Sequence, residues 1–324
     1  MTAMLQYLII LLDKASVSFC SLSPSPSPKG EGNCLMPLDT LQQGIRFGMM
    51  ENLMIQYVYP NYELPAEYSD VIESIDHSKI KSLPPTPPKE GRMDADVWVT
   101  ESIKDIKADV PVVWRTDKQS LFDSDADIII KALKNVPRLN VVLTDVETFT
   151  EEEFEKYSSL LEKLSKAIEQ MYVDGKSPQL NLLTDRMMLS KMNNCGAGDT
   201  NITLAPNGKF YVCPAFYYED ETDCVGDLEH GLDIKNKQLY KLEYAPICRH
   251  CDAWQCKRCV WLNRKTTLEV NTPSHEQCVV AHLERNASRE LMNNIRKHGS
   301  FLPEQEEIKE IDYLDPFDKR DTWQ

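Results

Sequence analysis

The sequence predicts an α/β fold: a mostly parallel sheet, or an incomplete barrel, covered by helices and followed by a small cysteine-rich domain. Between residues 4 and 190, apolar strand-like runs alternate with helix-like runs, an order typical of parallel strands joined by covering helices. From about Asn194, cysteine, aromatic and turn residues dominate and leave little room for an apolar core. With 324 residues, of which 42% are hydrophobic, the chain can form one large or two moderate domains.

The alternating region begins with a strand in "LQYLIILLD", a helix in "PLDTLQQGIRFGMMEN" and a strand ended by proline in "LMIQYVYP". Further buried strands are expected in "DADVWVT", "VPVVWRT" and "RLNVVLTDV", separated by the helix-like runs "SIKDIKA" and "SDADIIIKALKNV". The run "TEEEFEKYSSLLEKLSKAIEQMY" predicts a long amphipathic helix, capped by Thr150 and with acidic residues in its first turn.

Two elements are expected after this region. In "ITLAPNGKFYVC" two alternating strands flank Asn207-Gly208, a pair that adopts the positive φ angles of a tight turn, so the segment predicts a β-hairpin. An amphipathic helix is expected at about residues 279–297.

The composition also predicts where the domains divide. We expect an α/β scaffold domain over residues 1–193, a cysteine-rich domain over 194–282, and a C-terminal helix with an acidic tail over 283–324. Two Pro/Ser-rich stretches, at 21–33 and 82–92, are interpreted as surface insertions, because their composition gives extended, solvated backbone.

Charge and targeting signals exclude several classes of function. A formal net charge of −15 argues against a general binder of nucleic acids or anionic membranes. The apolar run from Leu5 to Leu12 lacks the flanks of a secretory signal and is too short to span a membrane. We therefore expect a cytoplasmic protein with no nucleic-acid and no membrane partner. Thiols stay reduced in the cytoplasm, so a cysteine cluster there predicts a metal site rather than disulfides.

The cysteines are strongly clustered. Seven of the ten lie between Cys195 and Cys259, and Cys278 follows. The first half of the array is Cys195, a gap, and then Gly208-x4-Cys213. The second half reads Cys248-x2-Cys251-x4-Cys256-x2-Cys259.

Two-residue spacings let neighbouring thiolates converge on one metal, as in zinc ribbons and iron–sulfur sites. Seven cysteines are too many for one tetrahedral ion, so we expect two centres. Cys20 and Cys34 have no partners at ligand spacing and are left out of the site.

The array resembles the SPASM domain, which holds auxiliary [4Fe-4S] clusters in radical SAM peptide maturases. The likeness covers roughly residues 195–278, although the inner spacings are x4 and x2 where that domain usually has x5 and x3. Over most of its length, including "QYLIILLD", "ENLMIQYVYP" and "IDHSKI", the chain is similar to the CXXX repeat peptide maturases. These proteins are associated with small ribosomal peptides that contain repeated cysteines.

The resemblance implies two [4Fe-4S] clusters. One would be held by Cys248, Cys251, Cys256 and Cys278. The other would be held by Cys195, Cys213 and Cys259, with Cys224 as the candidate fourth ligand. The implied partner is a cysteine-repeat precursor peptide, and the implied function is to act on that peptide or to present it.

The radical SAM motif itself is missing. No Cys-x3-Cys-x2-Cys triplet occurs in residues 1–194, and no glycine-rich loop that could cradle SAM is found there, so no SAM-binding residue is identified. The chemistry is therefore expected from a separate radical SAM enzyme or from an unrecognised mechanism. The competing hypothesis is a zinc-stabilised module that binds a peptide or protein without redox chemistry.

Other chemically suggestive residues have simpler explanations. Asp145, with Glu147 nearby, follows a strand where many α/β enzymes place carboxylates, but a solvated strand end explains it better, so no catalytic residue is assigned. Trp254 and Trp261 are expected to shield the metal site. His250, the histidine nearest the cysteines in sequence, is expected behind the ligands or at the surface. The methionines, which include Met49, Met50, Met187 and Met188, are expected to pack internally.

Overall fold

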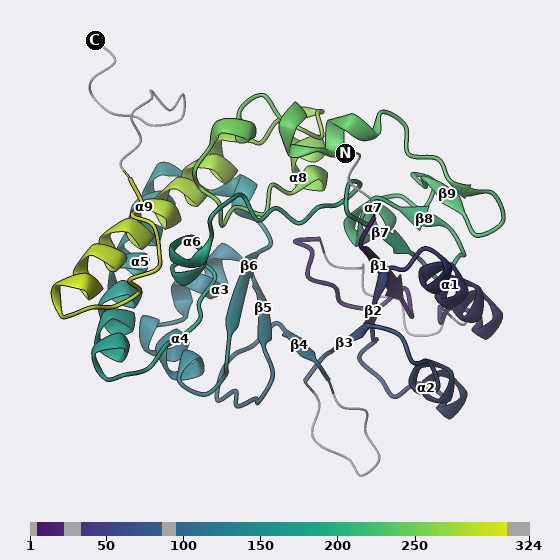
Figure 1. Ribbon diagram of the computed structural model, residues 1–324, viewed down its shortest axis with the longest axis horizontal. Coiled ribbons are helices and arrows are strands. Elements are labelled where there is room, and N and C mark those ends of the chain that lie inside the picture. Colours follow the sequence, from purple (N-terminus) through teal and green to yellow (C-terminus); the bar gives the residue numbers. More distant parts are fainter. Residues whose placement is uncertain (1–4, 23–33, 86–94, 310–324) are drawn as a thin grey trace. The chain divides into compact units, whose positions relative to one another are not determined.

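The computed structural model describes residues 5–22, 34–85 and 95–309 (Figure 1). Most of both predicted insertions and the end of the acidic tail lie outside the described residues. The chain divides into two compact units. The first unit consists of residues 1–101, 110–115 and 196–245. The second unit consists of residues 102–109, 116–195 and 246–324.

The main sheet has the strand order β6-β5-β4-β3-β2-β1-β7-β8. Strands β1 to β5 pair in parallel, as do β1 and β7, whereas β8 pairs antiparallel with β7. The mostly parallel α/β fold predicted from the sequence is therefore confirmed. The strands are β1 (Tyr7–Leu11), β2 (Met54–Val58), β3 (Lys79–Leu83), β4 (Val97–Thr100), β5 (Val112–Thr116), β6 (Leu139–Leu143), β7 (Asn201–Leu204) and β8 (Phe210–Tyr211).

The predicted hairpin is formed by β7 and β8. Thr203 lies opposite Tyr211 and Leu204 opposite Phe210. Gly208 has a φ of +77°, and the Asn207 side chain accepts a hydrogen bond from the Lys209 N–H at 3.1 Å. Because β7 pairs with β1, this hairpin extends the sheet of the first unit and delivers Cys213 directly after β8.

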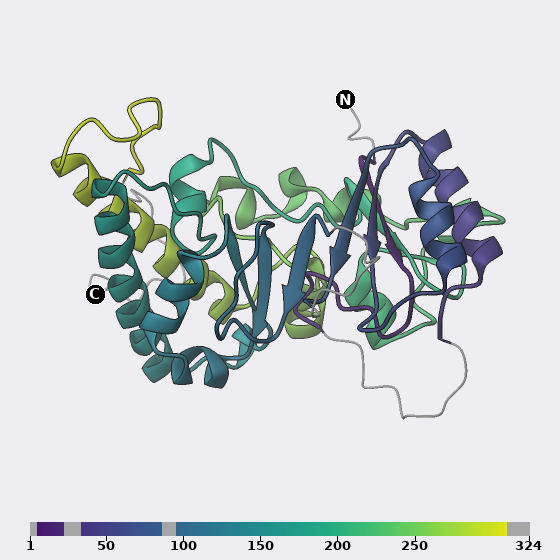
Figure 2. The ribbon, with the colours of Figure 1, turned by 90° about the horizontal axis from the view of Figure 1, so that it is seen from below.

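The first unit has its core between this sheet and two helices, α1 (Leu38–Met50) and α2 (Ala66–Glu73). Figure 2 shows α1 and α2 on one face of β1 and β2. Gly44 and Gly48 face the strands from α1, where a Cβ would meet Leu204 or Ile55. The remaining elements are α7 (Pro214–Glu219), the small ribbon of β9 (Gly226–Asp227) and β10 (Gly231–Leu232), and the 3-10 turns η2 (Lys237–Tyr240) and η3 (Leu242–Tyr244).

The second unit is mainly helical. Its longest helices, α5 (Glu151–Val173) and α9 (His275–Lys297), run side by side (Figures 1 and 2). Helix α5 begins with a capping box in which the Glu153 carboxylate accepts the Thr150 N–H at 2.7 Å, which confirms Thr150 as the cap. The other elements are α3 (Lys118–Asp123), α4 (Ala126–Leu133), α6 (Thr184–Met188), α8 (Val260–Thr267), η1 (Val146–Thr148) and η4 (Cys248–His250).

The structure differs from the sequence predictions in several elements. "SIKDIKA" forms no helix, and neither α2 nor β3 was predicted. Helix α9 begins at His275, earlier than expected, because Ser274 caps it by accepting the Gln277 N–H at 3.3 Å. Cys278 therefore lies on the helix rather than before it. Among the described helices, none combines the length and the hydropathy needed to cross a bilayer.

Candidate metal centre

The predicted ligands belong to both units. Cys213 and Cys224 lie in the first unit. The second unit holds Cys195, Cys248, Cys251, Cys256, Cys259 and Cys278. None of these cysteines forms a disulfide bond. Within the residues that the structure describes, no three His, Cys, Asp or Glu side chains are grouped closely enough to hold a metal ion.

Three thiols of the second unit, those of Cys248, Cys251 and Cys256, lie close enough to interact electrostatically. Burial, with a smaller contribution from the nearby Cys251 thiol, raises the pKa of Cys248 to about 11. Burial likewise raises the pKa of Cys256 to about 12, with Cys248 and Cys251 as neighbours. Arg258 opposes both shifts, through its guanidinium at Cys248 and through its backbone N–H, which lies 3.4 Å from the Cys256 Sγ. Cys248, Cys251 and Cys256 are therefore electrostatic neighbours, although they do not form a metal-binding group among the described residues.

Cys251 also has a histidine neighbour that sequence reasoning missed. Its Sγ lies 3.4 Å from the Nε2 of His282, and it accepts the Ala253 N–H at the same distance. His282 follows Cys278 by one helical turn on α9, and this i,i+4 spacing is the signal that could have revealed it. His250 is exposed, as expected.

The loop between Cys251 and Cys256 is held by two buried arginines. Arg285 from α9 donates to both carboxylate oxygens of Asp252, and the Arg186 Nε donates to the Asp252 carbonyl at 2.6 Å. The Arg186 guanidinium also lies 4.0 Å from the centre of the Trp254 ring. The geometry of the cysteine loop is thus fixed by neighbours on α6 and α9.

Backbone hydrogen bonds join the segment before Cys195 to the same loop. The Asn193 N–H donates to the Trp254 carbonyl at 2.8 Å, and the Cys195 N–H donates to the Lys257 carbonyl at 3.0 Å. Cys195 therefore lies beside the stretch that carries Cys256 and Cys259. Trp261, at 2% exposure, is buried after Cys259, which is compatible with the predicted shielding role.

A partly buried carboxylate borders the cysteine loop. Glu284 on α9 accepts the Tyr157 hydroxyl at 2.7 Å, and the Gln255 Nε2 lies 3.4 Å from its other oxygen. Burial raises the pKa of Glu284 to about 7, despite these hydrogen bonds. The charge of the Glu284 carboxylate contributes to the raised pKa of the Cys256 thiol. Sequence analysis did not single out Glu284, because an acidic residue on an amphipathic helix is ordinarily solvated.

In the first unit, Cys213 lies next to Cys20. The two side chains form a hydrogen bond, which is the largest cause of a pKa of about 7 for Cys20. Cys20, which has no partner at ligand spacing in the sequence, thus has a thiol neighbour from a distant segment. Cys224 lies near Tyr211, whose pKa is raised chiefly by burial and also by that thiol.

Asp145 has a structural role. Its Oδ1 accepts the Lys118 N–H at 2.9 Å, and burial raises its pKa. Glu147 forms an ion pair with Lys265 at 2.6 Å. Both carboxylates are partly buried, so the interpretation of a solvated strand end is wrong, and each takes part in a structural contact.

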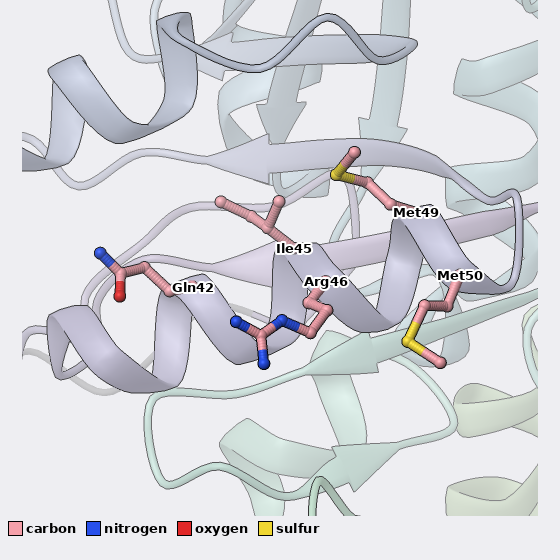
Figure 3. Close-up of a pocket in the computed structure, with 5 residues that line it drawn as sticks. All are labelled: Gln42, Ile45, Arg46, Met49 and Met50. Carbon is pink, nitrogen blue, oxygen red and sulfur yellow. The ribbon is translucent and has the colours of Figure 1, made fainter.

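The depression on the outer face of α1 contains no thiol or carboxylate. Gln42, Ile45, Arg46, Met49 and Met50 line it (Figure 3). Met49 and Met50 are 45% and 78% exposed, so the prediction that they pack internally is wrong, and it is also wrong for the exposed Met188. Met187 is buried, as predicted.

Comparisons with known proteins show the fold. No protein-family model matches the chain, and no curated protein matches it. Among solved structures, it is similar to anSMEcpe, a radical SAM anaerobic sulfatase-maturating enzyme. The structure of native anSMEcpe with bound AdoMet has a TM-score of 0.58 at 14% identity, over 90% of this chain and 99% of that one. The structure of native anSMEcpe with bound AdoMet and Cp18Cys peptide has a TM-score of 0.55 at 13% identity, again over 90% of this chain and 99% of that one. The chain thus shares the fold of these structures.

Proposed function

We propose that this chain is an iron–sulfur protein of a ribosomal peptide maturation system. It acts on, or presents, a small cysteine-repeat peptide together with a separate radical SAM enzyme. The fold similarity to maturase structures that contain a bound peptide supports the general role. The missing Cys-x3-Cys-x2-Cys triplet is the reason for assigning the radical chemistry to a partner.

The observation that carries the proposal is the electrostatic interaction among the Cys248, Cys251 and Cys256 thiols, with Arg258 acting on Cys248 and Cys256. Soft thiolates suit iron–sulfur clusters, and the nearby cation offsets the negative charge that they would acquire. Because burial raises the pKa of Cys248 and of Cys256, binding a metal there requires that these two thiols release protons. The donor set therefore fits a thiophilic centre.

We assign the first cluster to Cys248, Cys251, Cys256 and Cys278. The second set, Cys195, Cys213 and Cys259 with Cys224 as candidate, rests on the sequence pattern. A [4Fe-4S] cluster in this chain would transfer electrons or bind a substrate thiolate. The protein's own part is to fix the loop through Asp252 and to exclude water with Trp261.

Zinc is the alternative, and one contact favours it. Cys251 and His282 lie at a distance that two ligands of one tetrahedral ion can have, and Cys248-x2-Cys251 with Cys278-x3-His282 matches the spacing of zinc sites. In that case the chain is a binding module without redox chemistry.

Anaerobic analysis of iron, sulfide and zinc, with an absorption spectrum, tests the proposal. Two clusters predict about eight irons per chain with matching sulfide. Changing Cys248 and Cys251 together to Ala should remove about half of the iron, whereas Cys34→Ala should remove none. Zinc without sulfide would overturn the iron–sulfur assignment and favour the alternative.

A further inference from the structure

A short segment after α9 runs back along that helix. Helix α9 ends at Lys297, and the chain reverses direction through Gly299, whose φ of +154° suits glycine. Residues 302–309, which we call the strap, then pass alongside α9 and are bright yellow in Figure 1. The strap, α9 and the cysteine loop all belong to the second unit.

Two arginines of α9 hold the strap by its backbone. Arg296 donates through Nη2 to the Leu302 carbonyl at 3.1 Å and to the Gln305 carbonyl at 2.6 Å. Arg285 lies about three turns earlier on the same side of α9, and its Nη2 donates to the Lys309 carbonyl. The later contacts of the strap are made with the earlier part of the helix, so the strap runs antiparallel to α9.

Arg285 joins the strap to the cysteine loop. Its guanidinium donates to both carboxylate oxygens of Asp252, which lies in that loop, as well as to the Lys309 carbonyl. The arginine side chain is 1% exposed. One buried cation therefore binds the loop and the strap at the same time.

The strap also interacts with the second arginine that holds the loop. Arg186 donates through Nε to the Asp252 carbonyl at 2.6 Å. Burial lowers the pKa of Arg186, and the charges of Asp252 and of Glu306, a residue of the strap, oppose this shift. Both arginines that bind Asp252 are thus in contact with, or close to, the strap.

The strap has little buried surface of its own. Of its eight described residues, Ile308 alone is buried, at 3% exposure. The exposed residues are Pro303, Glu304, Glu306, Glu307 and Lys309. Segments with few buried apolar contacts open at a lower free energy than the core does. The strap can therefore detach while α5 and α9 remain folded.

We propose that the strap controls the conformation of the cysteine loop. When the strap is attached, it keeps Arg285 out of water, and the buried ion pair with Asp252 fixes the loop. When the strap detaches, water reaches the Arg285 guanidinium. The ion pair then weakens, because exposed ion pairs contribute little to stability, and the loop becomes more mobile.

Through this coupling, the segment after α9 regulates two candidate metal ligands. Asp252 directly follows Cys251, and Cys256 ends the same loop. A change in the attachment of the strap is therefore transmitted to the positions of both thiols. The coupling does not depend on the proposed function, because it acts on the loop whether the loop binds iron, zinc or no metal.

Hydrogen–deuterium exchange of the full-length chain, followed by mass spectrometry, tests the proposal. The loop suits this method, because the N–H groups of Cys251, Trp254 and Cys256 donate backbone hydrogen bonds. Ile308→Ser removes the buried side chain of the strap, and burial of an isoleucine typically changes an equilibrium constant by about tenfold or more. We expect exchange in residues 251–256 to become about tenfold faster. The middle of α5 should exchange at its original rate.

Two further full-length variants complete the test. Arg296→Ala removes the hydrogen bonds to the Leu302 and Gln305 carbonyls without changing Arg285, and it should also speed exchange in the loop. Glu307→Ser, at the exposed position beside Ile308, should leave it unchanged. Unchanged loop exchange in both Ile308→Ser and Arg296→Ala would overturn the proposal. Equally faster exchange in α5 would overturn it too, because the strap would then stabilise the whole unit rather than the loop.

Discussion

Arg285 and Asp252 form a largely buried ion pair, and Asp252 lies in the loop between Cys251 and Cys256. The Arg285 Nη2 lies 2.6 Å and its Nε 3.0 Å from the Asp252 Oδ2. The arginine side chain is 1% exposed and the aspartate 26%. Because Asp252 directly follows Cys251, this contact ties the loop to α9, the helix that carries Cys278 and His282.

Arg285→Leu should lower the free energy of unfolding by about 3 kcal/mol, the lower end of the range for losing one partner of a buried pair, because Asp252 keeps some solvent contact. Urea denaturation followed by circular dichroism measures this. Lys166→Ala breaks the exposed pair with Glu162 and should cost less than about 0.5 kcal/mol. Equal losses of unfolding free energy in the two variants would show that the contact with Asp252 stabilises the chain no more than an exposed ion pair does.

His282→Ala should weaken metal retention. The Nε2 of His282 lies 3.4 Å from the Cys251 Sγ, so the ring either stabilises the thiolate by a hydrogen bond or is itself a ligand. Loss of such a neighbour typically lowers metal affinity about tenfold or more. The measurement is the metal retained after a timed challenge with a chelator. His250→Ala, at an exposed position in the same cysteine-rich stretch, is the matched control. Identical retention in the two variants would exclude a role for His282.

Glu284 should make the stability of the chain fall as pH rises from about 4.5 to about 7. Burial raises its pKa from 4.5 to about 7 in the folded chain. Between these values the folded chain binds the proton and the unfolded chain does not, so raising the pH favours unfolding. The expected loss is on the order of 2 kcal/mol across this window.

Glu284→Gln should flatten that slope and give a chain more stable than the original at pH 8, because the amide carries no charge to bury. Unfolding in urea at several pH values provides the measurement. Glu290→Gln, at an exposed position on the same helix, should leave the slope unchanged. A slope that persists in the Glu284 variant would mean that another group is responsible.

The sequence predicted the alternating strands and helices well, because β1, β2 and β5 are almost continuous apolar runs and α5 has a clear helical period. It missed β3, where Lys79 and Lys81 interrupt the apolar pattern. The structure explains these lysines: the Lys79 ammonium donates to the Ile72 carbonyl, and Lys81 pairs with Glu73. When long polar side chains in a strand reach polar partners at the edge of the core, the sequence lacks the apolar pattern of a strand and is interpreted as a loop.

For the candidate site, the sequence allows contacts to be predicted only between cysteines that are a few residues apart. The x2 and x4 intervals predict that Cys248, Cys251 and Cys256 are neighbours, and in the structure these thiols interact electrostatically without forming a metal-binding group among the described residues. They could not show that Cys20 meets Cys213, because that contact depends on how the loop after β1 is attached to α7. Short intervals constrain local geometry, whereas contacts between distant segments are set by the tertiary fold.

Gly44→Ala should destabilise the chain, although alanine is ordinarily the better helix former by about 1 kcal/mol. A Cβ at Gly44 would lie 2.3 Å from the Leu204 Cδ2, and Leu204 is fully buried in β7. Because Ile10 also borders the site, at 3.6 Å, Leu204 has little space in which to move. Overpacking of this kind typically costs about 1–3 kcal/mol. Thermal or urea unfolding measures the change, and Gln42→Ala on the exposed face of α1 should be nearly neutral. If Gly44→Ala instead stabilised the chain, α1 would have to pack less closely on β1 and β7 than the structure places it.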